Sequence, residues 1–129
     1  MRALLCPASL KGVLGAAAAA AALARGVREA GCEAVELPIA DGGEGTAEAL
    51  AAAHGGEWRS ALVSDPLGRP VEARWLLLPD GRAVVEAAAA IGLPLLRPEE
   101  RDPLRASSRG LGELCLAALR AGASGLVVA

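Results

Sequence analysis

The spacing of apolar and polar residues predicts a parallel α/β unit at the start of the chain. The apolar run at 3–6 stops at Pro7 and is typical of a strand that is buried on both faces. An alanine-rich segment at 16–30, ended by Gly31, predicts a helix, and 34–37 predicts a second strand. Since a strand, a helix and a strand in this order form a parallel pair, we expect the loops after both strands at one edge of a sheet.

The pattern changes after a second predicted helix at 46–54. Strand-like segments at 57–64, 71–78 and 83–87 are separated by turn sequences, which predicts an antiparallel meander. We therefore expect a second lobe to begin near residue 60, so that residues 1–60 and 61–129 belong to different lobes.

The last third of the chain predicts irregular structure, then a helix and a strand. Residues 87–105 contain three prolines, and Ser107 or Ser108 is expected to cap a helix with an apolar stripe. The run 126–129 predicts another buried strand. Because a domain rarely ends on a bare apolar strand, we expect this chain to be an N-terminal fragment of a longer protein.

Composition and charge exclude several classes of function. The formal net charge of −2 is spread without blocks, so neither a nucleic-acid footprint nor a membrane-binding patch is expected. Alanine is too weakly apolar, and Lys11 comes too early, for a signal peptide or a membrane span. The 3 cysteines lack CxxC spacing, which favours reduced thiols in a cytoplasmic protein. With 2% aromatic residues, the core is expected to consist of small aliphatic side chains.

The segment 38–46 reads Pro-Ile-Ala-Asp-Gly-Gly-Glu-Gly-Thr and joins the second predicted strand to the helix that begins at Thr46. Its glycines permit tight turns and close approach, and free N–H groups at a helix start favour an anion. The carboxylates of Asp41 and Glu44 beside such a site suggest a metal ion or a proton transfer. The segment matches neither standard phosphate-loop fingerprint, and a purely structural turn is the alternative.

Lys11 is expected at the same sheet edge. A lysine, two carboxylates and a helix N-terminus are what phosphoryl transfer from a magnesium nucleotide requires. Taken singly, Lys11 fits a solvated side chain better than a catalytic one, and Ser9 is compatible with a hydrogen bond inside its own loop. Ser108 is compatible with a helix cap or with a helix start that faces a substrate carboxylate or phosphate.

At these residues the chain resembles the glycerate kinase family of bacteria. Residues 6–12 are similar to the family's A-P-D-S-F-K-G opening, and 38–46 reproduce its P-x-A-D-G-G-E-G-T signature. Further matches lie at 65–74, 85–89 and 92–95, and at positions 107, 108, 110 and 112–114, so that the resemblance covers the whole chain. Ala8 departs from the family's Asp, which leaves Asp41 as the acid on which a metal or base role depends.

The resemblance implies two α/β lobes, one of them a parallel flavodoxin-like lobe that is incomplete here. It implies ATP-dependent phosphorylation of D-glycerate to 2- or 3-phosphoglycerate, with Mg²⁺. Under this reading Asp41 and Lys11 are catalytic, and Asp41 and Glu44 hold the metal. The expected substrate-binding residues are Ser9, Gly42, Gly43, Glu44, Thr46 and Ser108.

Two other functions stay open at this point. One is a non-catalytic module that binds a small carboxylate or phosphate ligand with the same loops. The other is a truncation that is inactive by itself. The sequence predicts no oligomeric state.

Overall fold

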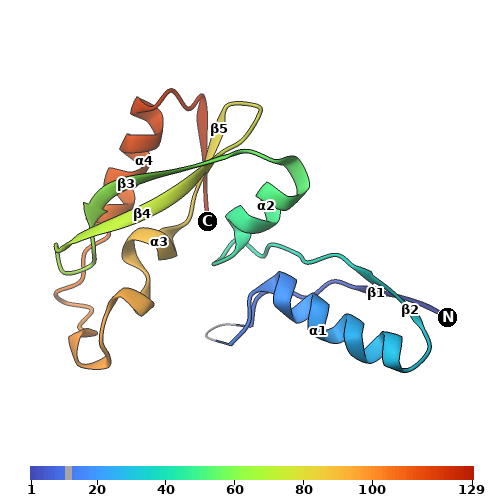
Figure 1. Cartoon of the computed structure of the whole chain (residues 1–129). Helices are drawn as coiled ribbons and strands as arrows, with labels where there is room; N and C mark the ends of the chain where they lie inside the picture. The colour runs from blue at the N-terminus through green and yellow to red at the C-terminus, as the bar shows by residue number, and fades with distance from the viewer. Residues whose placement is uncertain (11–12) are drawn as a thin grey trace.

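The computed structural model describes residues 1–10 and 13–129. Strands and helices alternate in the first part of the chain. The second part forms a four-stranded sheet with helices on both faces (Figure 1). The strands are β1 (Arg2–Leu5), β2 (Glu33–Glu36), β3 (Glu57–Ser64), β4 (Pro70–Leu77), β5 (Arg82–Val85) and β6 (Gly125–Val128). The α-helices are α1 (Ala16–Glu29), α2 (Thr46–His54), α3 (Ala87–Ile91) and α4 (Arg109–Arg120).

The strands β1 and β2 form the predicted parallel pair, with Arg2 opposite Glu33 and Leu5 opposite Glu36. Helix α1 packs on this pair through alanines, namely Ala16, Ala19, Ala20 and Ala24. The expected burial of β1 on both faces was wrong, since Leu4 is 62% exposed. Among the described residues, only α1 packs extensively on this two-stranded sheet, so one of its faces stays uncovered.

The second sheet has the order β3-β4-β5-β6 and confirms the predicted meander. β3, β4 and β5 are antiparallel neighbours, whereas β6 pairs with β5 in parallel. β6 lies at an edge of the sheet, and Val128 is 54% exposed, which corrects the expectation of a buried strand.

Helices cover both faces of the second sheet. Since successive side chains on a strand point to opposite faces, neighbouring residues of β4 pack against different helices. On one face, Trp75 packs in a buried cluster with Leu114 of α4 and Ala90 of α3. On the other face, Leu76 packs with Ala47 of α2. Figure 1 shows α2 between this sheet and the unit formed by β1, α1 and β2.

The region expected to be irregular contains the short helix α3 and two 3₁₀ turns, Leu93–Leu95 and Pro98–Glu100. The alanine run at 87–90 favours a helical turn. Pro94 and Pro98 occupy the first two positions of the two 3₁₀ turns, where a missing N–H costs nothing, and Pro103 lies in the turn that follows. The N-cap position of α4 is Ser108, but the hydroxyl that accepts from the Arg109 N–H, at 3.2 Å, belongs to Ser107.

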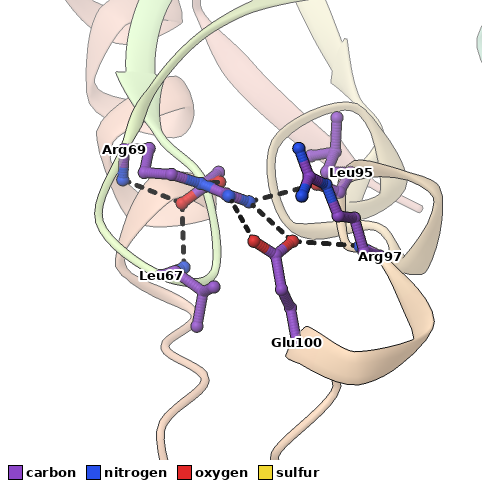
Figure 2. A network of polar contacts seen from close by, with 6 residues as sticks. Leu67, Arg69, Leu95, Arg97 and Glu100 are labelled. Atoms are coloured by element: carbon purple, nitrogen blue, oxygen red, sulfur yellow. Dashed lines mark hydrogen bonds and ion pairs between the residues drawn. The ribbon is translucent and has the colours of Figure 1, made fainter.

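A network around Arg69 fastens the β3–β4 turn to the second 3₁₀ turn (Figure 2). Asp65 is 5% exposed and accepts hydrogen bonds from the N–H groups of Leu67 and Arg69, each at 2.8 Å. The Arg69 guanidinium donates to Asp65 at 2.6 Å and to Glu100 at 2.8 Å. Glu100 also accepts from the Arg97 N–H, so the turn and the 3₁₀ segment hold each other in place.

The change from one sheet to the other occurs between β2 and β3, and α2 packs on the second sheet. The division of the chain into domains at residue 60 stays a prediction. None of the described helices is long and apolar enough to cross a membrane.

Candidate active site

The acidic loop at 38–46 leaves the carboxyl end of β2 and enters α2. The loop after β1 runs beside it: the Leu37 N–H donates to the Leu5 carbonyl at 2.8 Å, and the Ile39 N–H to the Pro7 carbonyl at 3.0 Å. This confirms that the loops following the two parallel strands share one sheet edge. Lys11, which we expected at this edge, lies outside the described residues.

The loop folds back on itself through its glycines. Gly42 and Gly45 have φ of 87° and 93°, a left-handed conformation that other residues rarely adopt. The Gly43 N–H donates to the Asp41 carboxylate at 3.2 Å, and the Thr46 N–H donates to the Gly43 carbonyl at 3.1 Å. The side chains of Asp41 and Glu44 are exposed, so both carboxylates are accessible to a ligand.

A cavity of about 590 Å³ lies between the loop after β1, the start of α1 and one side of α2. It brings together two of the expected site residues, Ser9 and Glu44. Leu10, Val13 and Leu14 contribute apolar walls. The cavity therefore has an apolar body, with one hydroxyl and the two carboxylates of Glu44 and Glu48 on its lining.

The N-terminus of α2 holds a carboxylate that belongs to the chain itself. The Ala47 N–H donates to Glu86, the residue after β5, at 2.8 Å. Burial raises the pKa of Glu86, and hydrogen bonds from the backbone at the start of α2 only partly offset this effect. The helix start that we expected to offer free N–H groups to a substrate anion thus already has an internal anionic partner.

A smaller cavity of about 210 Å³ lies between α2 and the second sheet, and Glu44 lines it as well as the larger one. Arg74 of β4 stacks over the Trp58 ring at 4.4 Å from its centre and pairs with Glu48 of α2. Glu86 completes the acidic side of this cavity. Within residues 1–10 and 13–129, no group of three or more His, Cys, Asp or Glu could hold a metal ion.

The remaining expected residues differ in their placement. Thr46 is 7% exposed, and its hydroxyl has no hydrogen-bond partner among the described residues. Ser108 is exposed at the start of α4, which packs on the face of the second sheet opposite α2. The structure therefore groups Ser9 and Glu44 at one cavity and does not place Ser108 on its lining.

Glu86 is the residue of this region that sequence reasoning missed. One signal was present: Gly45, which precedes the helix, has no side chain with which to cap it. The acceptor therefore had to come from elsewhere in the chain, but the sequence does not show from where.

Comparison with known proteins covers nearly the whole chain. The model of the glycerate kinase family matches residues 3–129. The glycerate 2-kinase of Escherichia coli K12 is 47% identical, and the glycerate kinase of Bacillus subtilis 168 is 44% identical, each over 99% of this chain. A solved structure described as glycerate kinase 2 of Salmonella typhimurium LT2 matches 99% of the chain with a TM-score of 0.71 and 38% identity.

Fold and site together define a part of a two-lobed α/β protein, with a glycine-rich acidic loop where its two sheets meet. The chain belongs to the glycerate kinase family. It spans about a third of the length of the curated relatives that it matches, 34% for both the E. coli and the B. subtilis protein.

Proposed function

We propose that this chain supplies the acidic loop of an ATP-dependent glycerate kinase, which phosphorylates a hydroxyl group of D-glycerate. The observation that carries this proposal is the family match over residues 3–129, which includes the whole loop from Pro38 to Thr46. The relative named glycerate 2-kinase, at 47% identity, favours the 2-hydroxyl as acceptor and 2-phosphoglycerate as product.

Asp41 is the proposed catalytic carboxylate. Its hydrogen bond from the Gly43 N–H holds the side chain against its own loop, while its exposure leaves room for a substrate. In this role Asp41 accepts the proton of the glycerate hydroxyl or holds Mg²⁺, with Glu44 assisting. In phosphoryl transfer, most of the catalysis comes from positioning the reacting groups and from stabilising charge, and a carboxylate in either role contributes to this.

The donor set fits magnesium. Mg²⁺ is usually bound by one or two carboxylates together with substrate phosphates and water, and does not need a cage of protein ligands. Asp41 and Glu44 are exposed carboxylates of one loop and match this requirement. When bound, the ion would offset negative charge on the nucleotide phosphates.

The other expected residues have supporting roles. Ser9 is proposed to bind substrate, because its loop and Glu44 share the larger cavity. Gly42 and Gly43 allow close approach of the substrate to the backbone, and the Thr46 hydroxyl has no hydrogen-bond partner in the part of the chain that the structure describes. Lys11 is proposed to offset charge on the transferred phosphoryl group, and Ser108 to bind substrate from the second lobe.

Two broader features belong to the same proposal. The two lobes divide near residue 60, so that the loop lies close to their junction. The protein is proposed to act in the cytoplasm on small molecules, in keeping with its three free cysteines.

A chimaeric enzyme tests the proposed function, and the test does not depend on whether the 129-residue chain is active by itself. In it, residues 1–129 replace the matching third of E. coli glycerate 2-kinase, and ADP release is measured with D-glycerate and Mg²⁺-ATP. We expect turnover, and a loss of roughly 10² to 10³ in kcat for Asp41→Asn, on the scale of a lost charge-stabilising group. Asp80→Asn, an exposed aspartate in the β4–β5 turn, is the matched control and is expected to keep full activity.

Retention of more than about a tenth of the turnover by Asp41→Asn contradicts the catalytic role, since such groups contribute at least this much. A chimaera that folds and binds D-glycerate but releases no ADP favours the non-catalytic binding module. Running the same assay on the 129-residue chain shows whether it is active by itself.

A further inference from the structure

We propose that Glu86 is a positioning residue, which fixes the loop bearing Asp41 and Glu44 from the end of β5. The catalytic consequence rests on the proposed function, whereas the conformational role does not. Nothing in the loop's own sequence assigns this role, because Glu86 is 39 residues away from its contact along the chain.

The first step of the argument is the missing cap of α2. The helix starts after Gly45, which makes no side-chain cap and whose φ of 93° suits glycine. Its neighbour Thr46 is buried, and its hydroxyl bonds to no described residue. Glu86 therefore replaces the cap with a carboxylate on the Ala47 N–H at 2.8 Å.

The second step is the continuity between this contact and the catalytic carboxylate. Ala47 follows Thr46, whose N–H donates to the Gly43 carbonyl, and the Gly43 N–H donates to Asp41. Every link in this path is a hydrogen bond or a peptide bond. The orientation of Asp41 is thus tied to Glu86, the residue that follows β5 of the second sheet.

The third step is the surroundings of Glu86. The carboxylate is half-buried and lines the smaller cavity together with Glu44 and Glu48. Arg74 of β4 lines the same cavity. Burial and the charge of Glu48 both raise the pKa of Glu86. A carboxylate kept in so unfavourable a place points to a specific task there, and the N–H group that it accepts from, that of Ala47, lies at the start of α2.

Glu113 provides a matched control. Its carboxylate also accepts a distant backbone N–H, that of Ser64 at 2.7 Å, but at the junction of α4 and β3. A loss of general stability affects both variants, whereas a positioning role affects the acidic loop only in the Glu86 variant.

The experiment is amide hydrogen exchange, followed by NMR, on the 129-residue chain and its variants. In Glu86→Ala we expect exchange of the Ala47 and Thr46 amides to rise about tenfold or more, the effect of losing one charge-assisted hydrogen bond. Glu86→Gln keeps an acceptor oxygen and is expected to stay within about threefold of the native rate. Glu113→Ala is expected to change exchange at Ser64 and leave Ala47 as it is. Equal protection of Ala47 in Glu86→Ala and Glu113→Ala overturns the proposal.

Turnover of the chimaera tests the catalytic consequence. We expect Glu86→Ala to lower kcat about 10- to 100-fold with a smaller change in KM, because a misplaced loop impairs the reaction more than binding. Glu86→Gln should restore most of kcat. If Glu86→Ala keeps the native kcat although its Ala47 amide exchanges faster, the positioning role is overturned. The proposed kinase activity then stays intact. An inactive native chimaera contradicts the proposed function, while the exchange data still decide whether Glu86 holds the loop.

Discussion

The unit formed by β1, α1 and β2 and the second sheet are built from similar apolar strands but differ in how they are packed. In the second sheet, Trp75 is 2% exposed and Leu76 is fully buried, because helices lie on both faces. In the first unit, Leu4 is 62% exposed and the buried contacts are made by alanines of α1. The comparison teaches that an apolar strand is buried only to the extent that other layers cover it.

The acidic loop belongs to both regions. It leaves the first unit from β2, and its helix packs on the second sheet. The sparsely packed unit therefore carries the loop after β1, while the well-packed sheet anchors the start of α2. Changes that distinguish the two regions test this arrangement.

The largest difference is expected from two leucine-to-alanine changes. Leu114→Ala removes a fully buried side chain from the core between α4 and the sheet and should cost about 2–5 kcal/mol. Leu4→Ala should cost under about 1 kcal/mol, because this side chain already lies mostly in solvent. Urea unfolding measures both.

Tryptophan fluorescence reports on the second sheet, because the 2 tryptophans, Trp58 and Trp75, lie in β3 and β4. Circular dichroism follows the secondary structure of both regions, so the two signals together separate them. Leu114→Ala should shift the fluorescence midpoint, and Leu4→Ala should leave it in place. A Leu4→Ala variant as unstable as Leu114→Ala contradicts the difference in packing.

The next effect is a pair of glycine changes within α4. A Cβ on Gly110 would lie 1.7 Å from the Ser64 carbonyl oxygen, so Gly110→Ala must push the helix away from β3. We expect a loss of about 1–3 kcal/mol or more. At Gly112 a Cβ would meet nothing within 4 Å, so Gly112→Ala should stabilise the helix by about 0.5–1 kcal/mol. Thermal unfolding of the two variants should give Tm shifts of opposite sign, and a lowered Tm for Gly112→Ala would contradict the tight α4–β3 contact as the cause.

The smallest expected effect is a loss of stability at low pH, which we assign to Asp65 at the β3–β4 turn of the second sheet. Burial raises the pKa of Asp65, but the hydrogen bonds from Arg69 and Leu67 outweigh burial and hold the pKa below its ordinary value. A carboxylate with a lowered pKa stabilises the protein above its unfolded pKa, and this stability is lost as the pH falls through the folded pKa. The native protein should therefore lose stability below the ordinary value of 3.8, and Asp65→Asn should lose less over the same range.

Added salt should distinguish this network, in which the acid Asp65 is buried, from a similar pair in which both partners are exposed. Asp80 also accepts from the N–H and guanidinium of a nearby arginine, Arg82, but its side chain is 50% exposed. Raising the salt concentration should weaken the contribution of Asp80 more than that of Asp65, since pairs that are partly buried are screened less. Equal salt dependence of Asp65→Asn and Asp80→Asn, measured by urea unfolding, would contradict this assignment.

Much of the local structure followed from the sequence. The parallel pair, the meander and the helices α1, α2 and α4 were all expected, because strands, helices and turns leave short-range patterns of apolar residues, glycine and proline. The helix α3 was not expected, since three prolines at 87–105 obscured its alanine run. The loop at 38–46 was singled out by its residues, but its neighbours in space were not.

The sequence by itself determined which residues carry the candidate chemistry and which family the chain resembles, since motifs and turn signals are read along the chain. Only the tertiary structure decided that Glu86 occupies the α2 start, that Ser9 and Glu44 share a cavity, and that Leu4 is exposed. The physical reason is that burial and hydrogen-bond partners depend on which layers and side chains meet. Such contacts join residues as far apart as Ala47 and Glu86, and local patterns do not record them.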